Sequence, residues 1–400
     1  MKIAYLMHGI GWGGAAGSLM LLLKGLKNYS ATKYFYTSID RENKAKKEFI
    51  RLTDYYKQID LPQLKNDLAG GYTNIKDFER IIGLNYSNLI NELIKNKIDI
   101  IHINSTVFSH VLKPIKENTS VKTVMHVREM LPKYDNGEVR NYMLKSIEDY
   151  ADSIICISDN EAKQFGNKEK VCVMANPFDF DSLENIKDDF FKQTNINKDH
   201  LLIAMSGQFS PSRGHKAFLE AIYILLKKYP LDTNSIKFLV FGGAKQTPYW
   251  KVLLKKVLNK TDISYEYKRT IKNKKLSKNI ITFPTLYTDD FHSMLKHIDV
   301  YVRPSLAGNP WGRDIIEAMA FGKPIIATGN STFYVKPDKN GYLINPNEPE
   351  VMADKMYELI NDKEKRKIMG ENAHIIVKEK CDLNKYTHDL KKIYKQIINC

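Results

Sequence analysis

The feature that most constrains the fold of this 400-residue chain is an alternation of short apolar runs with longer amphipathic stretches of helical period. The apolar runs are rich in β-branched residues, and a glycine or polar turn usually follows each of them. Such an alternation predicts an α/β fold, in which helices cover both faces of a parallel sheet. In the first half the predicted strands are 3–7, 34–38, 98–103, 122–126 and 153–157, and the predicted helices include 18–26, 75–95 and 138–150.

The second half repeats this pattern with a complete second set of elements. Its predicted strands are 201–205, 238–241, 280–283, 300–302 and 324–327, and its predicted helices are 217–228, 249–258, 291–297, 315–321 and 351–360. Two sets predict two Rossmann-like, doubly wound parallel-sheet domains, since 400 residues exceed what one hydrophobic core usually fills. We expect these domains to face each other across a cleft, with ligands beyond the carboxyl ends of the strands.

The boundary between the domains is predicted where Asn176-Pro177-Phe178-Asp179 breaks the periodicity. A residue before proline resists the helical conformation, so a linker is expected there. The predicted domains are therefore 1–178 and 179–382. A last helical pattern over 383–398 has no strand after it, so it could pack on either domain.

The composition excludes several other classes of protein. An apolar fraction of 43% with 11% aromatic residues argues against disorder. No apolar run approaches the roughly 18 residues that a membrane span needs. The four cysteines form no CxxC pair, which argues against a disulfide scaffold or a cysteine zinc site. We therefore expect a cytoplasmic protein.

The first candidate loop follows strand 3–7 and reads Gly9-Ile10-Gly11-Trp12-Gly13-Gly14. It matches the G-x-G-x-x-G pattern of dinucleotide-binding folds, and Asp40 stands where a ribose-binding acid would belong. The acid comes 26 positions after Gly14, however, which is later than the usual spacing of about 20. Two other interpretations stay open: a tight strand-to-helix turn, or an anion site formed by the backbone N–H groups of Gly13, Gly14 and Ala15.

The second candidate loop runs from Gly207 to Gly214, between a predicted strand and a predicted helix. Arg213 stands near the start of that helix, so its guanidinium and the first N–H groups of the helix together suit a diphosphate. Gln208 could add a neutral donor. The alternative is that Arg213 is an ordinary solvated surface charge.

The third candidate loop lies between strand 300–302 and helix 315–321. Asn309 and the N–H groups of Trp311 and Gly312 could contact sugar hydroxyls and phosphate, and Glu317 could accept hydrogen bonds from ribose hydroxyls. Asp314-x-x-Glu317 also has the spacing of a capping box, so the carboxylate could instead satisfy only backbone donors.

These motifs together resemble those of retaining nucleotide-sugar glycosyltransferases of family 4 (glycosyl transferases group 1), which have the GT-B fold. The clearest match is Pro304-Ser305 followed by Glu317-Ala318-Met319-Ala320-Phe321-Gly322-Lys323-Pro324. The resemblance covers nearly the whole chain, and its other parts are Gly13-Gly14, Asp99-Ile100-Ile101-His102, His126-Val127-Arg128-Glu129, Ser158, Asn176-Pro177-Phe178-Asp179, Gly207-x5-Arg213-Gly214 and Asn340-Gly341-Tyr342-Leu343.

The resemblance implies a role for each candidate residue. Glu317 would bind the ribose, Arg213 the diphosphate, and His126 the sugar near its reacting carbon. The donor sugar would lie against Asn309, Pro310, Trp311 and Gly312, while Gly13 and Gly14 would face the phosphates and the acceptor. Gly207 and Gln208, in the second candidate loop, would also contact the nucleotide-sugar donor. The last helix would cross back and complete the first domain with residues 383–400.

Three residues depart from the family pattern and bear on donor binding. Asn309 stands where the family has the first Glu of its Glu-x7-Glu pair, so that side chain carries no charge. Gln208 replaces the family's Arg, and Arg213 replaces its Lys, which leaves one cation fewer for the diphosphate. These changes affect the expected donor sugar and phosphate affinity more than the expected fold.

The predicted reaction moves a sugar from a nucleoside-diphosphate sugar to a glycan or lipid-linked acceptor, as in bacterial surface polysaccharide biosynthesis. Arg213 and backbone donors can neutralise the leaving diphosphate, so no metal and no cofactor are expected. Asp179-x-Asp181 and Asp289-Asp290 are interpreted as structural. The alternatives are a nucleotide-sugar epimerase of the same fold, a dehydrogenase using the Gly9–Gly14 loop, or a non-catalytic nucleotide-sugar-binding homologue.

The net charge of +15 raises the question of an anionic partner. Ten basic residues fall within 251–278, which most often means a solvated face but would also suit anionic lipid at the inner face of the cell membrane. A smaller patch consists of Lys44, Lys46, Lys47 and Arg51. Nucleic acid is not expected, because no recognisable binding module is present.

Overall fold

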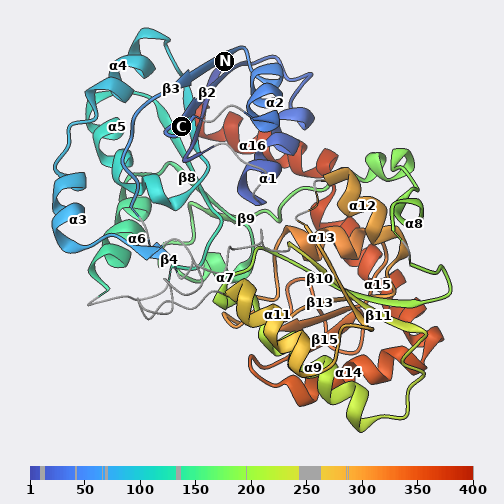
Figure 1. Cartoon of the computed structure of the whole chain (residues 1–400). Helices are drawn as coiled ribbons and strands as arrows, with labels where there is room; N and C mark the ends of the chain where they lie inside the picture. The colour runs from blue at the N-terminus through green and yellow to red at the C-terminus, as the bar shows by residue number, and fades with distance from the viewer. Residues whose placement is uncertain are drawn as a thin grey trace. The chain divides into compact units, whose positions relative to one another are not determined.

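The structure is a computed structural model that describes residues 1–9, 14–40, 43–64, 66–67, 71–131, 137–194, 196–242, 263–284, 286 and 288–399. The chain divides into two compact units (Figure 1), the first formed by Met1–Asp179 with Lys380–Cys400 and the second by Phe180–Glu379. Each unit is built on one parallel sheet, of seven strands in the first and six in the second. The predicted fold class, two Rossmann-like domains with parallel sheets, is confirmed.

The sheet of the first unit has the strand order β3-β2-β1-β6-β7-β8-β9, and every pairing in it is parallel. The order reverses between β1 and β6, so the loops after these two strands flank the topological switch point of the sheet. The strands are β1 (Lys2–Met7), β2 (Thr32–Thr37), β3 (Tyr55–Gln58), β6 (Ile100–Ile103), β7 (Lys122–Val127), β8 (Ser153–Cys156) and β9 (Val171–Val173). A separate short antiparallel pair joins β4 (Asn66–Asp67) to β5 (Gly71–Tyr72).

Helices pack on both faces of the first sheet because successive buried side chains of its strands point to opposite faces. Ile3, Tyr5 and Met7 pack with α1 (Gly14–Gly25), α2 (Lys44–Leu52) and α16 (Leu383–Asn399). Ala4 and Leu6 belong to the opposite core, with α3 (Ile75–Ile82), α4 (Ser87–Lys95), η1 (Thr106–Val111), α5 (Leu112–Asn118) and α6 (Glu138–Tyr150). The four-residue α7 (Asp159–Ala162) follows β8.

The stretch predicted as one helix, 75–95, forms two helices instead. The first ends at Ile82, with Gly83 as its C-cap, and the second begins at Ser87. Between them Tyr86 takes a left-handed conformation with a φ of 52°. The apolar period continues through the break, so periodicity alone could not place it.

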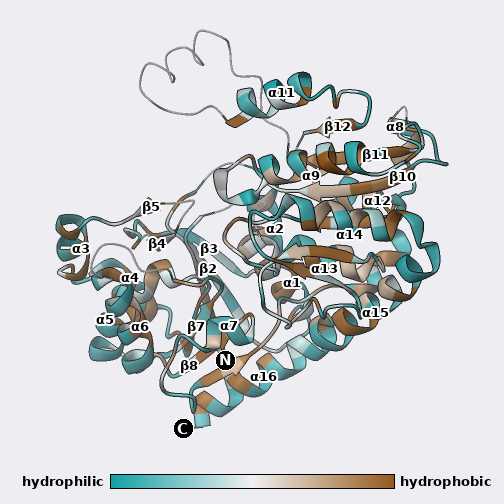
Figure 2. Cartoon of the chain, turned by 90° about the horizontal axis from the view of Figure 1, so that it is seen from below, coloured by the Kyte–Doolittle hydropathy of each residue, from teal (hydrophilic) through white to brown (hydrophobic). Residues whose placement is uncertain are grey.

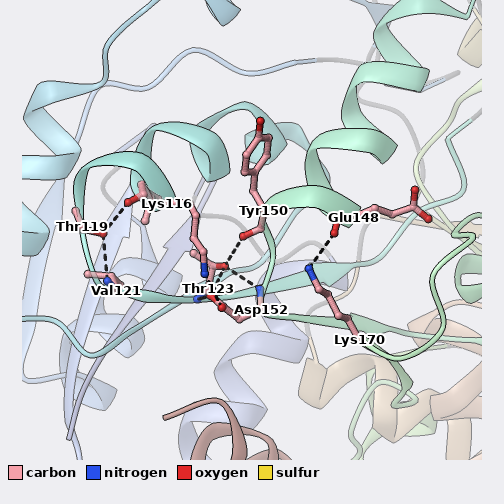
Figure 3. A network of polar contacts seen from close by, with 9 residues as sticks. Lys116, Thr119, Val121, Thr123, Glu148, Tyr150, Asp152 and Lys170 are labelled. Atoms are coloured by element: carbon pink, nitrogen blue, oxygen red, sulfur yellow. Dashed lines mark hydrogen bonds and ion pairs between the residues drawn. The ribbon is translucent and has the colours of Figure 1, made fainter. Parts of the chain in front are cut away.

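A polar network closes the amino end of the first sheet, away from the predicted site. Asp152 accepts hydrogen bonds from the backbone N and the hydroxyl of Thr123 at 2.8 and 3.0 Å, and pairs with Lys116 at 2.8 Å (Figure 3). Thr123 lies at the start of β7, whereas His126 lies near the carboxyl end of the same strand. The network therefore anchors β7 at the end opposite to the predicted catalytic residue.

The sheet of the second unit has the order β12-β11-β10-β13-β14-β15 and is again entirely parallel. Its strands are β10 (Leu201–Ser206), β11 (Ile236–Phe241), β12 (Ile280–Phe283), β13 (Val300–Arg303), β14 (Ile325–Thr328) and β15 (Gly341–Ile344). Strands β10 and β11 are mainly hydrophobic (Figure 2), as expected for strands buried on both faces. The switch point of this sheet lies between β10 and β13.

The helices of the second unit include one pair that shares a core with the sheet. Helices α9 (His215–Lys228) and α14 (Pro349–Asn361) bury their apolar sides together against one face. The remaining described helices are η2 (Phe180–Asn185), α8 (Phe190–Gln193), η3 (Pro211–Arg213), α11 (Ile263–Asn273), α12 (Thr288–His297), α13 (Arg313–Ala320) and α15 (Lys363–Cys381). The predicted helix 249–258 lies outside the described residues, as does the first part of the basic run, 251–262. None of the described helices has the length and apolarity of a membrane span.

Candidate active site

Two of the predicted loops meet at the switch point of the second sheet. The backbone N of Leu306, in the loop after β13, donates to the carbonyl of Ser212, in the loop after β10, at 2.8 Å. The hydroxyl of Ser305 lies 3.4 Å from the same carbonyl. The structure therefore brings the Gly207–Gly214 loop and the 303–312 loop together at the carboxyl end of the sheet, where ligands of open α/β sheets bind.

Gly214 is the point of closest approach between these loops. Its φ is +77°, and a Cβ at this position would lie 1.6 Å from the carbonyl oxygen of Pro304.

We expect Gly214→Ala to destabilise the second unit by about 3 kcal/mol or more, because it combines left-handed strain with a backbone clash. Urea unfolding measures this cost, with Gly166→Ala as the matched control since its Cβ would meet only Glu148 Oε1 at 3.5 Å. Equal stability of the two variants would contradict the close approach.

Arg213 has a guanidinium that is available to a ligand. It ends η3, directly before Gly214 and α9. Within the described part of the chain its side chain makes no hydrogen bond and no ion pair. Its aliphatic stem passes over Gly207, where a Cβ would lie 3.2 Å from Arg213 Cδ. Gln208, next to that glycine, is exposed.

The start of α13 lies within the electrostatic reach of Arg213. Burial raises the pKa of Asp314, but the charges of Arg303 and Arg213 outweigh burial and hold that pKa below its ordinary value. The carboxylate of Asp314 is paired with Arg303 and accepts from the hydroxyl of Tyr301 at 2.9 Å. The diphosphate residue predicted from the second loop thus lies close to the helix start that follows the third loop.

The third loop is held in place by Arg303, a residue to which no sequence motif assigned a role. Arg303 Nε donates to the carbonyl of Asn309 at 2.9 Å while its Nη1 pairs with Asp314. A Cβ on Gly312 would lie 2.6 Å from Asp314 Oδ1, so this turn needs glycine. The backbone N–H groups of Trp311 and Gly312 donate to no described residue, and Pro310 is buried. Those two N–H groups therefore remain available to a ligand.

Glu317 lies in the second turn of α13, where its carboxylate is buried and one of its two oxygens has partners. Its Oε1 accepts from Arg313 Nε at 2.7 Å and lies 3.4 Å from His292 Nε2. Burial raises its pKa, but the charge of Arg313 and the contact with His292 bring it below the ordinary value, so the group is a carboxylate. No described residue donates to Oε2, which leaves one oxygen for a ligand hydroxyl.

The capping-box interpretation of Asp314 and Glu317 is wrong. Gly312, not Asp314, is the N-cap of α13. The two carboxylates accept from side chains instead, Asp314 from Tyr301 and Arg303 and Glu317 from Arg313. Their spacing could not reveal this, because each partner depends on the local geometry of the folded loop.

In the first unit, the glycine loop is only partly described. Gly13 lies outside the described residues, while Gly14 begins α1 and is exposed. Asp40, the acid considered for a dinucleotide ribose, pairs with Lys46 at 2.9 Å and accepts from the hydroxyl of Tyr56 at 2.9 Å. Its carboxylate is thus engaged inside the unit, which disfavours the dehydrogenase interpretation.

His126 is fully buried near the carboxyl end of β7. Its Nδ1 lies 3.1 Å from Nε2 of His102 and 3.3 Å from Nη2 of Arg128. Its Nε2 is buried and has no hydrogen-bond partner among the described residues. Burial, together with the charge of Arg128, lowers the pKa of His126 well below its ordinary value, so the imidazole is neutral near pH 7.

Arg128 is a further candidate whose role the sequence did not reveal. Its Nε and Nη2 donate to Oδ1 of Asn104 at 3.0 and 2.8 Å, and its Nη1 donates to Asn176. Asn104 also donates to the carbonyl of Ala15 at 3.3 Å. These contacts tie the loops after β6 and β7 to the start of α1, at the switch point of the first sheet. The sequence signal that could have pointed to Arg128 is its position as a charged residue directly after a buried strand.

Comparisons with known proteins bear on the family and the fold of this chain. Residues 186–375 match the family model described as glycosyl transferases group 1. Among solved structures, HepE of Anabaena in complex with UDP and glucose matches with a TM-score of 0.76 and 18% identity over 99% of each chain. Sucrose-phosphate synthase of Thermosynechococcus elongatus matches with a TM-score of 0.73 and 15% identity, over 100% of this chain and 99% of that one. The predicted resemblance is confirmed by the family model, and the structural matches confirm the GT-B fold.

The matches to relatives found by sequence span smaller shares of the two chains than the structural matches do. An uncharacterized glycosyltransferase of Methanocaldococcus jannaschii is 31% identical over 32% of this chain and 34% of its own. The first three relatives, all from that organism, are matched over 31% to 63% of their length. A D-inositol 3-phosphate glycosyltransferase of Corynebacterium urealyticum is 22% identical over 80% of this chain and 73% of its own.

Proposed function

We propose that this chain, whose residues 186–375 belong to the glycosyl transferases group 1 family, transfers a sugar from a nucleoside-diphosphate sugar to a glycan or lipid-linked acceptor with retention of configuration. The observation that carries the proposal is the meeting of two loops at the β10/β13 switch point. There Arg213 lies near the start of α13, and neither its guanidinium nor one oxygen of Glu317 has a partner among the described residues.

Each part of the donor has a matching group in the second unit. The diphosphate suits Arg213 and the N–H groups of Trp311 and Gly312, because a guanidinium and backbone donors neutralise anionic oxygens. The ribose suits Oε2 of Glu317, since a carboxylate accepts strongly from hydroxyls. Asn309 would hydrogen-bond the donor sugar without adding charge. Complexes of HepE with UDP make a uridine nucleotide the first donor to test.

The proposed reaction is a front-side displacement at the anomeric carbon. The bond from that carbon to the diphosphate oxygen breaks while a bond to the acceptor oxygen forms on the same face. The acceptor's proton passes to the departing phosphate oxygen, so atoms and charge balance without a protein base. Arg213 stabilises the charge that develops on the diphosphate. In the first unit, His126 is assigned to a hydrogen bond with the sugar rather than to general-base catalysis.

The function is tested by incubating the protein with UDP-, GDP-, ADP- and CMP-linked sugars, with and without glycan acceptors. Release of nucleoside diphosphate that depends on the acceptor supports transfer. Epimerised sugar would replace the proposal by the epimerase alternative, and NAD reduction would replace it by the dehydrogenase alternative. A nucleotide that raises Tm without any turnover would identify a binding protein.

Glu317→Gln is expected to raise KM for the donor by about tenfold, with a smaller loss of kcat, because the amide can still accept from Arg313 but binds ribose hydroxyls more weakly. Steady-state kinetics with varied donor measures this. Glu350→Gln, an exposed acid in the first turn of α14, is the control. Unchanged kinetics of Glu317→Gln would remove Glu317 from the ribose site.

A further inference from the structure

A row of buried polar side chains connects the last helix of the chain to His126. The hydroxyl of Tyr394, on α16, lies 2.7 Å from Nδ1 of His102, on β6. Nε2 of His102 lies 3.1 Å from Nδ1 of His126, on β7. All three side chains have 0% exposure, so water does not compete for these contacts.

The direction of these hydrogen bonds follows from the one member that can only donate. Arg128 Nη2 lies 3.3 Å from Nδ1 of His126, and a guanidinium has no acceptor. Nδ1 of His126 must therefore be the unprotonated nitrogen. Nε2 of His102, which faces the same atom, must carry its own proton and donate it there.

The other end of the row agrees with this direction. If His102 is protonated on Nε2, its neutral ring accepts at Nδ1, and Tyr394 supplies the O–H donor. Burial lowers the pKa of His102 to about 3, and the charge of Arg128 acts in the same direction. Burial and the neighbouring Tyr5 raise the pKa of Tyr394 well above its ordinary value, so its hydroxyl keeps the proton.

One donor remains at the end of the row. With Nδ1 accepting, the neutral imidazole of His126 carries its proton on Nε2. That nitrogen is buried without a partner among the described residues, and leaving a buried donor unsatisfied costs free energy. Such a cost is compensated when a ligand brings an acceptor oxygen.

We infer that His102 and Tyr394 are positioning residues, which together with Arg128 hold His126 in the tautomer protonated on Nε2 and so make it an obligatory hydrogen-bond donor to the ligand. The C-terminal helix would thus set the chemistry of a residue 268 positions earlier in the chain, besides packing against the sheet. The inference rests on the proposed function only for the identity of the acceptor, a sugar oxygen.

The tautomer can be measured without any activity. In protein labelled with [15N]histidine, two-bond couplings between ring protons and nitrogens distinguish the two neutral tautomers, and the spectrum of His126→Gln identifies the His126 signals. We expect the wild type at pH 7 to show only Nε2 protonation at His126. Tyr394→Phe should introduce some of the Nδ1-protonated form. His102 then loses the donor that fixed its own ring and can present an unprotonated Nε2 to His126, against the longer 3.3 Å contact from Arg128.

The matched control is Tyr386→Phe. Tyr386 lies on the same helix and is also buried, but its hydroxyl has no hydrogen-bond partner in the described part of the protein. Tyr386→Phe should leave the tautomer unchanged.

With a nucleotide-sugar donor and a sugar acceptor supplied, we expect Tyr394→Phe and His102→Leu to lower kcat about 5- to 10-fold with KM for the nucleotide sugar within about twofold. His102→Gln offers the same donor and acceptor, so it should retain several times the kcat of His102→Leu.

The outcomes separate this inference from the proposed function. An Nδ1-protonated His126 in the wild type, or a Tyr394→Phe spectrum identical to that of the wild type, would overturn the inference whatever the activity. A protein that transfers no sugar but shows the expected tautomers would overturn the proposed function and leave the positioning roles supported. Equal loss of kcat in Tyr394→Phe and Tyr386→Phe would show that the hydroxyl matters only for packing, which also overturns the inference.

Discussion

Arg213→Ala is expected to lower kcat/KM for the nucleotide-sugar donor by about 100- to 1,000-fold, the usual cost of removing a group that stabilises charge in the transition state. Its Tm should stay within about 2 °C of the wild type, because the guanidinium makes no hydrogen bond or ion pair with the described residues. The large kinetic effect and the small stability effect together would mark a residue kept for the ligand. Steady-state kinetics and thermal unfolding of the same samples measure both.

Two further variants sharpen this test. Arg213→Lys keeps the charge but loses the planar fork of donors, so we expect a loss of about tenfold. Lys216→Ala removes an exposed cation from the first turn of α9, three residues further on, and should change kcat/KM less than twofold. If Lys216→Ala and Arg213→Ala lose activity equally, the effect is general charge around the loop, and Arg213 is not the diphosphate ligand.

The fold could be predicted wherever burial leaves a local pattern in the sequence. The strand 280–283 has the predicted bounds, since its run is flanked by Asn279 and Pro284. Strand β3 (Tyr55–Gln58) was missed because it is an edge strand with mostly exposed side chains and no apolar run. Helix α15 (Lys363–Cys381) was missed for a similar reason, since charged residues crowd its first turns and hide the helical period.

The residues of the candidate site also fall into two groups, those that stand in a short sequence motif and those whose contacts join distant parts of the chain. Arg213 and Glu317 could be found because each stands in a short motif beside a predicted strand. The pairing of Arg303 with Asp314 follows only from the path of the folded loop. The contact between His102 and Tyr394 joins residues 292 positions apart, and no spacing rule connects them. Sequence motifs therefore indicated the residues that we propose to touch a ligand, but not those that hold them in place.

Lowering the pH from 7.5 to 5 is expected to destabilise the first unit by about 6 kcal/mol, through three buried histidines that contribute about 2 kcal/mol each. Burial lowers the pKa of His102 and His110 to about 3, and that of His126 well below its ordinary value. These pKa values in the folded protein lie below the value of about 6.5 in the unfolded chain. Between the two values the unfolded chain binds more protons, so stability is complete above pH 6.5 and falls as the pH drops toward 3.

The second unit should respond less to the same change of pH. Its one histidine with a comparable shift is His215, among the residues described, where burial lowers the pKa to about 4 and predicts a loss of about 2 kcal/mol. Native-state hydrogen exchange, corrected for intrinsic rates, reports the opening free energy of each unit separately. His110→Leu removes one titrating group from an apolar site between Tyr86 and Phe108, so it should reduce the loss in the first unit to about 4 kcal/mol. Equal losses in both units, or an unchanged pH dependence in His110→Leu, would show that the buried histidines do not govern acid stability.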